Sequence, residues 1–245
     1  MKSAIAVALL AISLAGCTKG WDASNAQTAD TTLARDTAAD ARRHGPEIAA
    51  FVGLKSGDKV IDLIPGGGYW TRTFARTVGP TGHVYGIWPK PYAQEAGTDV
   101  KKYDALTRDP NFSSVSVAIQ PAAELKAAEP VDLVFTSQNY HDYPDKFMGP
   151  TDPAILNKAV FAALKPGGIY LIVDHSAAPG SGLRDTETLH RIDPAIVRKQ
   201  VEAAGFVFVG ESKLLANPAD DHTKAVFDKS IRGRTDQFIY KFRKP

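Results

Sequence analysis

Short apolar runs alternate with amphipathic stretches along most of the chain. Seven runs, rich in β-branched and aromatic residues, have the length and composition of strands; they cover residues 59–64, 83–88, 114–119, 131–137, 169–174, 206–213 and 237–242. Patterns with a helical period separate them, over residues 46–52, 69–78, 92–106, 153–164 and 194–204. This alternation predicts an α/β fold, in which helices cover a largely parallel sheet, and the last two strands can pair antiparallel across their loop.

The first sixteen residues have a different pattern. Lys2 is followed by an uncharged run that ends in Leu-Ala-Gly before Cys17. This is typical of a secretory signal, and the run is shorter than the roughly 20 apolar residues that a membrane span needs. The segment resembles the lipobox of bacterial lipoproteins, in which the cysteine is lipidated and becomes the new N-terminus. We therefore expect export and a lipid anchor on Cys17, at the periplasmic face of the cell envelope. Thr18 favours onward transfer to the outer membrane, and an ordinary secretory signal is the alternative.

The predicted signal divides the chain into three parts. Residues 1–16 form the signal peptide, and residues 17–34 form the lipidated cysteine and a flexible tether without an apolar period. A single domain then covers residues 35–245. The 29 basic and 27 acidic residues are scattered and give a net charge of +2, which argues against a nucleic-acid surface. The single cysteine excludes an internal disulfide.

A glycine-rich turn follows the first predicted strand. Asp62 lies late in that strand, Gly66, Gly67 and Gly68 form the turn, and a helix starts at Tyr69. Glycines let the backbone approach a ligand closely, and helix N-termini offer unpaired N–H groups. Ligands of open α/β sheets bind at the carboxyl ends of strands. The turn therefore predicts a nucleotide-like cofactor site, although tight packing of strand against helix also demands glycine.

Polar and aromatic side chains gather after the fourth predicted strand, where residues 136–143 read TSQNYHDY. We predict His141 as a general base and Asp142 as the carboxylate that orients it, because imidazole accepts protons near neutral pH. A structural histidine is the alternative. The candidate substrate-binding residues from this and neighbouring loops are Asn139, Tyr140, Tyr143, His175 and His190.

Asp174 and His175 end the fifth predicted strand, beside His141 and Asp142. These four side chains offer donor groups for a divalent metal ion, but adjacent residues of a strand point to opposite faces. We therefore assign no metal ligand. A metal-assisted hydrolase or lyase built on His141 and His175 stays an alternative function.

Four motifs together resemble the class I S-adenosylmethionine-dependent methyltransferases, from about residue 38 to residue 245. They are PGGGYWT at 65–71, QNYHD at 138–142, LKPGG at 164–168 and HRIDP at 190–194. The resemblance implies a Rossmann-like fold, with a mostly parallel seven-stranded sheet, an antiparallel last strand and helices on both faces. It also implies transfer of a methyl group from S-adenosylmethionine to a small-molecule acceptor.

The same resemblance assigns the cofactor site. Asp62, Gly66 and Gly68 match the acid and the later glycines of the family's first motif, with Gly67 between them, whereas Ile64 replaces its first glycine. The turn would thus hold the cofactor against the N-terminus of the following helix.

Two further cofactor-binding positions follow the next strands. Trp88 stands where most members offer an acid to the ribose hydroxyls, and Gln120 stands where the adenine amino group is bound. Because an indole donates and cannot accept a hydrogen bond, a ligand-binding lipoprotein without catalysis is the second hypothesis. Its aromatic candidates are Tyr69, Trp70, Trp88, Tyr140 and Tyr143.

Overall fold

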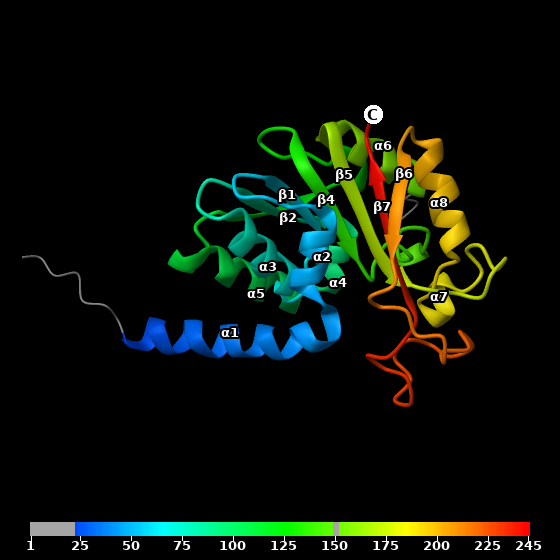
Figure 1. The fold of residues 1–245 in the computed structure, drawn as a ribbon, viewed down its shortest axis with the longest axis horizontal. Helices are drawn as coiled ribbons and strands as arrows, with labels where there is room; N and C mark the ends of the chain where they lie inside the picture. Colours follow the sequence, from blue (N-terminus) through cyan, green and yellow to red (C-terminus); the bar gives the residue numbers. More distant parts are fainter. Residues whose placement is uncertain (1–22, 149–151) are drawn as a thin grey trace, which may run out of the picture.

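A computed structural model of the chain describes residues 23–148 and 152–245 (Figure 1). The expected signal segment and Cys17 lie outside these residues. Among the described helices, none combines the length and hydrophobicity required to span a bilayer.

Seven strands form one sheet, in the order β3-β2-β1-β4-β5-β7-β6. Their bounds are β1 Lys59–Leu63, β2 His83–Pro89, β3 Val115–Gln120, β4 Val131–Ser137, β5 Leu164–His175, β6 Val207–Ser212 and β7 Gln237–Arg243. The first five strands are parallel, and β7 runs antiparallel to both β5 and β6. The predicted Rossmann-like methyltransferase fold is confirmed.

The helices cover both faces of the sheet (Figure 1). The α-helices are α1 Ala23–Arg43, α2 Gly45–Val52, α3 Tyr69–Val78, α4 Lys90–Glu95, α5 Gly97–Thr107, α6 Pro153–Ala163, α7 Thr186–Leu189 and α8 Pro194–Ala203. The 3-10 helices are η1 Pro110–Phe112, η2 Ala122–Glu124 and η3 Lys146–Met148. The chain moves from β1 to β2 in one direction along the sheet and from β4 to β5 in the other. Right-handed crossovers then place α3 and α6 on opposite faces, and the order of strands reverses at β1 and β4.

Two segments differ from the sequence prediction within the domain. The helix expected over residues 92–106 is two helices, α4 and α5, which meet at Ala96 before Gly97. The strand expected to begin at residue 169 begins at Leu164, where pairing with β4 shifts from Val131–Leu164 to Leu133–Ile169 and leaves a bulge. A Pro-Gly-Gly sequence ends a helix as readily as it forms such a bulge.

The flexible tether predicted for residues 17–34 is wrong from Ala23 onward, because these residues belong to helix α1 (Figure 1). Their alanine-rich composition has no apolar period and so gave no hydrophobic signal, but alanine is the strongest helix former. The domain boundary predicted at residue 35 consequently falls inside a helix.

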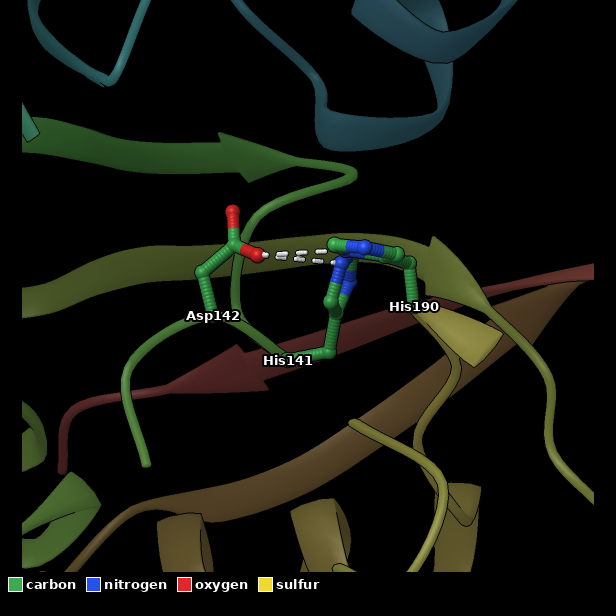
Figure 2. A group of neighbouring side chains, drawn as sticks. All are labelled: His141, Asp142 and His190. Carbon is green, nitrogen blue, oxygen red and sulfur yellow. Dashed lines mark ion pairs between the residues drawn. The ribbon is translucent and has the colours of Figure 1, made fainter. Parts of the chain in front are cut away.

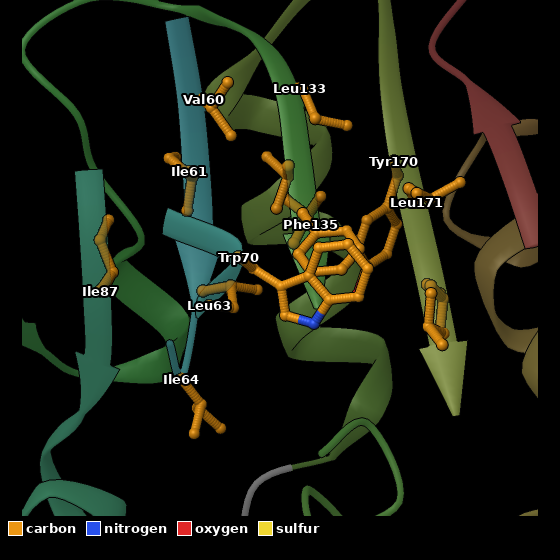
Figure 3. Close-up of a cluster of buried hydrophobic side chains, with 14 of the residues drawn as sticks. Val60, Ile61, Leu63, Ile64, Trp70, Ile87, Leu133, Phe135, Tyr170 and Leu171 are labelled. Carbon is orange, nitrogen blue, oxygen red and sulfur yellow. The ribbon is translucent and has the colours of Figure 1, made fainter. Parts of the chain in front are cut away.

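A hydrophobic core lies directly beneath the glycine-rich turn (Figure 3). Trp70, in the first turn of α3, stacks on Phe74 with 5.9 Å between ring centroids and packs against Phe135 of β4 at 4.8 Å. Buried aliphatic residues of β1 and β4 surround these rings, among them Ile61, Leu63 and Leu133. Burial of this cluster fixes the start of α3, and therefore the turn, against the strand ends.

A buried ion pair joins α1 to α3. Asp36 accepts hydrogen bonds from Nε and Nη2 of Arg72 at 2.8 and 2.7 Å, and from Nη2 of Arg76 at 2.7 Å. Burial alone would raise the pKa of Asp36, but the two guanidinium groups outweigh it and hold that pKa below its ordinary value. Nη1 of Arg72 also donates to the carbonyl of Gly67 at 2.9 Å. The ion pair therefore anchors both α1 and the glycine-rich turn.

Removal of this anchor tests its contribution to stability. In Asp36→Ala the buried guanidinium of Arg72 loses its counter-ion, so we expect the free energy of unfolding to fall by about 3–5 kcal/mol, as measured by urea unfolding. The control is Glu202→Ala, which removes an exposed ion pair with Arg198 and should change stability by about 0.5 kcal/mol or less. Equal losses in the two variants would contradict an anchoring role for Asp36.

Candidate functional site

A cavity of about 780 Å³ opens at the carboxyl ends of β1, β2 and β4. This is the point at which the strand order reverses, where open α/β sheets bind their ligands. The strand ends and the turn contribute Asp62, Ile64, Gly66, Gly67, Trp88 and Asn139 to its lining. Helix α1 adds a wall that the sequence did not predict, with Arg35, Asp36, Arg42 and Arg43.

The three glycines of the turn have separate roles. Gly66 and Gly67 line the cavity, and a Cβ atom added to either would have no neighbour within 4 Å. At Gly68, which is not among the lining residues, a Cβ would lie 3.0 Å from Nη1 of Arg72 and 3.1 Å from Leu106. Gly66 and Gly67 thus leave room for a ligand, whereas Gly68 is required for packing.

Ile64, which replaces the first glycine of the family motif, has a backbone conformation that favours glycine. Its φ is 52°, in the left-handed region that costs a non-glycine residue about 1–2 kcal/mol. The backbone is held on both sides, since Ile64 N–H donates to Ile87 at 2.9 Å and its carbonyl accepts from Nδ2 of Asn139 at 3.2 Å. These two hydrogen bonds hold the left-handed conformation of Ile64, whose apolar side chain lines the cavity.

Asp62 is a carboxylate almost without solvent contact, with 1% of its surface exposed. It accepts a hydrogen bond from Oγ1 of Thr71 at 2.6 Å. Burial raises the pKa of Asp62 to about 7, against the opposing effects of Thr71 and Arg43. The charge of this group therefore changes near neutral pH in the absence of a ligand.

The ends of β2 and β3 differ in their relation to the cavity. Trp88 lines the cavity, and its buried indole N–H has no hydrogen-bond partner among the described residues. Gln120 does not line it, because its side-chain amide exchanges two hydrogen bonds of 2.8 Å with the backbone of Lys126. Two acids that the sequence analysis did not identify also line the cavity. Asp99 lies in α5, and Asp109 directly precedes η1.

A second cavity, of about 390 Å³, adjoins the first and shares Tyr92, Ala96 and Gln138 with it. Its other lining residues are Glu95, His141, Asp142, Phe147, His175, His190, Val226 and Phe227. The loop at 217–234, for which the sequence offered no role, thus contributes Val226 and Phe227 to the wall. The two cavities therefore lie side by side and share one wall.

A network of histidine and aspartate side chains borders the second cavity. Nδ1 of His141 lies 2.8 Å from Oδ1 of Asp174, and Nε2 of the same ring lies 3.2 Å from Oδ1 of Asp142. His190 approaches the same oxygen of Asp142 with Nδ1 at 3.8 Å (Figure 2). The backbone N–H groups of His141 and His175 donate to Asp174 at 2.8 and 2.7 Å. The sequence placed these groups at one edge of the sheet but did not predict their order.

The two buried histidines have opposite electrostatic environments. Burial opposes the protonation of His141, but Asp174 and Asp142 outweigh it and raise the pKa of His141 to about 10. Burial lowers the pKa of His175 to about 4, and its Nδ1 lies 2.8 Å from Oγ1 of Thr235. Both nitrogens of His141 are engaged by carboxylates, so neither is free to take a proton from an acceptor, as the predicted general base would. His190, with 31% of its side chain exposed, faces the cavity more openly.

The predicted substrate residues separate into two groups. Asn139, His175 and His190 line one cavity or the other. Tyr140 and Tyr143 are fully buried and line neither. The hydroxyl of Tyr140 contacts Gln200 at 3.1 Å and Asn157 at 2.9 Å in the interior. The path of the backbone through the turn after β4, which the sequence alone does not fix, decides which side chains face a cavity.

Comparisons with known proteins agree with this architecture. A sequence profile described as a methyltransferase domain matches residues 54–214. The ubiquinone/menaquinone biosynthesis C-methyltransferase UbiE of Haemophilus ducreyi is 29% identical over 124 residues, which span 51% of this chain and 44% of that enzyme. The chain thus covers less than half the length of this curated relative.

Solved structures show the same fold at low identity. A SAM-dependent methyltransferase from Aquifex aeolicus has a TM-score of 0.59 at 16% identity, covering 82% of this chain and 89% of its own. A putative methyltransferase of Haloferax volcanii, solved with its Trm112 activator, has a TM-score of 0.59 at 20% identity, covering 90% and 97%. The [4+2]-cyclase SpnF has a TM-score of 0.62 at 18% identity, covering 84% and 81%. At these identities the likeness establishes the fold alone.

The raised pKa of Asp62 predicts a pH-dependent contribution of this group to stability. The folded state holds the proton to a higher pH than the unfolded state, so the contribution of Asp62 to the free energy of unfolding is greatest below about pH 4 and falls as pH rises to about 7. Asp62→Asn removes this penalty and can still accept from Thr71. We expect the variant to gain stability over the wild type by an amount that grows, to on the order of 1–3 kcal/mol, between about pH 5 and about pH 8. Urea unfolding of the ligand-free protein at the two pH values measures it, and a difference independent of pH would contradict the buried, titrating carboxylate.

Proposed function

Because the chain belongs to the methyltransferase domain family, we propose that it transfers a methyl group from S-adenosylmethionine to a small-molecule acceptor. One observation carries the proposal: a cavity of about 780 Å³ at the strand-order reversal, lined by Asp62, Gly66 and Gly67 of the family's first motif. Its volume lies in the range of small-molecule sites. The likeness to SAM-dependent methyltransferase structures supports the donor in general terms.

The lining of the large cavity suits this donor, with an aromatic residue where most family members have a ribose-binding acid. Gly66 and Gly67 leave open space for close approach of the ligand to the backbone, and ionised Asp62 offers a counter-charge to the donor's amino group. Trp88, Trp70 and Tyr92 bring aromatic rings to the same cavity, and such rings attract cationic centres such as a sulfonium. With Trp88 at the end of β2, Asp99 is an alternative acceptor for ribose hydroxyls on the facing helix.

The shared wall of the two cavities is where transfer would occur. The acceptor, in the cavity of about 390 Å³, uses a lone pair to form a bond to the methyl carbon while the carbon–sulfur bond breaks and sulfur keeps its electron pair. Such a reaction depends mainly on alignment of the two reactants. Tyr92 and Gln138, which border both cavities, are placed to align them. His141 and Asp142 belong to the acceptor side.

A second candidate is a non-catalytic ligand-binding protein on the same fold. The replacement of the family's ribose-binding acid by Trp88 favours it, because an indole cannot accept the hydrogen bonds of the two hydroxyls. The structural likeness to a [4+2]-cyclase illustrates that this fold does not determine one reaction.

A substitution in the turn tests the donor site without backbone strain. Gly67 has an ordinary φ and open space in the direction of a Cβ, so the side chain of Gly67→Val should project into the cavity. We expect calorimetric titration to show binding of S-adenosylmethionine and S-adenosylhomocysteine by the wild type, and affinity reduced at least about tenfold in the variant.

The matched control is Gly97→Val, which also fills open space but lies outside the cavity lining. It should bind the donor as the wild type does. Equal binding by Gly67→Val would place the donor elsewhere. No binding by the wild type at millimolar ligand would exclude the methyltransferase and favour the ligand-binding alternative.

We also propose that the protein is exported and anchored to the bacterial cell envelope through a lipid on Cys17. The lipobox-like sequence that precedes this single cysteine supports the proposal. In cells fed labelled palmitate, the wild type should carry the label and sediment with membranes, whereas Cys17→Ser should do neither, because serine lacks the thiol that is acylated. Thr18→Ala is the control that should keep the label. Labelling of Cys17→Ser would contradict the assignment.

A further inference from the structure

Three side chains in the second cavity bring potential metal ligands together (Figure 2). His141 and Asp142 come from the turn after β4, and His190 follows α7. One ligand atom of each lies within 4.8 Å of the other two. Two atoms bound to one metal ion at about 2.1 Å lie roughly 3.0–3.4 Å apart, and Nε2 of His141 already lies 3.2 Å from Oδ1 of Asp142. Nδ1 of His190 lies 3.8 Å from the same oxygen, close to the spacing of two atoms on one ion, and the ring is partly exposed.

Asp174 orients His141 as carboxylates orient metal-binding histidines. It lies 2.8 Å from Nδ1 of the imidazole, which directs Nε2 of the ring toward Asp142. Asp174 is itself fixed by the backbone N–H groups of His141 and His175. A carboxylate that accepts from the far nitrogen of a histidine is the usual support of a metal ligand. This support is not required for a histidine that merely fills space.

The charge of the cavity also favours a cation. The side chains of Asp142 and Asp174 are 6% and 0% exposed. Asp142 and Glu95 line the cavity, and Asp174 lies behind His141. The lining residues within the described chain include neither lysine nor arginine. Buried carboxylates require a compensating charge. A divalent ion that replaces the proton between Nε2 of His141 and Oδ1 of Asp142 leaves His141 neutral and balances the charges of Asp142 and Asp174.

We propose that His141, Asp142 and His190 bind a divalent transition metal ion, and that this ion holds an oxygen atom of the methyl acceptor. The second part rests on the proposed methyltransferase function. Two imidazoles and one carboxylate suit ions such as Zn²⁺, Fe²⁺ or Co²⁺, whereas Mg²⁺ and Ca²⁺ prefer oxygen ligands alone. Three protein ligands leave coordination positions open toward the cavity, as in catalytic sites.

The remaining lining defines the acceptor class. Tyr92, Phe147 and Phe227 present aromatic surface around the three ligands, which fits a hydroxylated compound with an apolar, ring-bearing body. A bound divalent ion favours loss of the hydroxyl proton to solvent. The resulting oxygen lone pair then bonds to the methyl carbon as the carbon–sulfur bond breaks. The products are a methyl ether and S-adenosylhomocysteine.

Cobalt titration of the full chain tests the site after removal of metal by a chelator, because Co²⁺ in such a site has a visible absorption spectrum. We expect the wild type to bind one Co²⁺ per chain by equilibrium dialysis, and His190→Asn to bind it at least about tenfold more weakly. His190 is chosen because it is partly exposed, whereas loss of buried His141 could prevent folding.

The matched control is His222→Asn. His190 and His222 both have positive φ, of 52° and 60°, which asparagine tolerates, and His222 also pairs with a carboxylate, Asp236 at 3.1 Å. It has no third ligand among the described residues, so its replacement should leave Co²⁺ binding unchanged. Absence of binding by the wild type, or equal binding by the two variants, would overturn the metal site.

An oxygen ligand tests the open coordination positions. Acetohydroxamate should change the Co²⁺ spectrum of the wild type, and acetamide, which chelates weakly, should not; an unchanged spectrum with both would overturn the acceptor assignment. Failure of the two proposals is distinguishable, because donor binding is measured at Gly67 without metal and Co²⁺ binding is measured without the donor.

Discussion

The burial of two carboxylates at one edge of the sheet governs the chemistry of this protein. Parallel strands end together, so β1 and β5 bring Asp62 and Asp174 to the same side of the molecule, where each loses almost all contact with water. Asp174 is compensated by His141 and two backbone N–H groups, which hold its pKa below the ordinary value. Asp62 has one hydroxyl, from Thr71. Asp174 is therefore ionised at neutral pH, whereas Asp62 is only partly ionised there in the absence of a ligand.

This difference gives the two cavities different electrostatic environments. An uncompensated carboxylate beside open glycines suits a ligand that brings its own positive charge, and it costs stability while the cavity is empty. Asp174 suits the positioning of His141, because the backbone N–H groups of His141 and His175 already hold its carboxylate in place. The cavity of Asp62 therefore depends on a ligand for charge compensation, whereas the cavity of His141 carries an internal network that keeps this imidazole in one orientation.

The sequence predicted the parts of the fold that depend on local patterning. All seven strands and the turn at Gly66 were predicted, because apolar runs and glycine clusters are visible within a few consecutive residues. Helix α1 was missed because its attachment depends on Asp36 and Arg72, which are far apart in the chain. The approach of His190 to Asp142 was missed for the same reason. The left-handed conformation of Ile64 carries no sequence signal, since a β-branched residue normally avoids it.

Backbone strain in the described chain gathers around the two cavities. Five non-glycine residues have positive φ, namely His44, Ile64, Gln138, His190 and His222. Three of them, Ile64, Gln138 and His190, line the large or the adjoining cavity. Such conformations persist only where surrounding contacts hold them, and here the N–H of Ile64 donates to Ile87 and that of Gln138 to Val173. Glycine would relieve the strain at each position but would remove a side chain from the cavity wall. Retention of the side chain at this energetic cost is the pattern expected where the wall itself has a function.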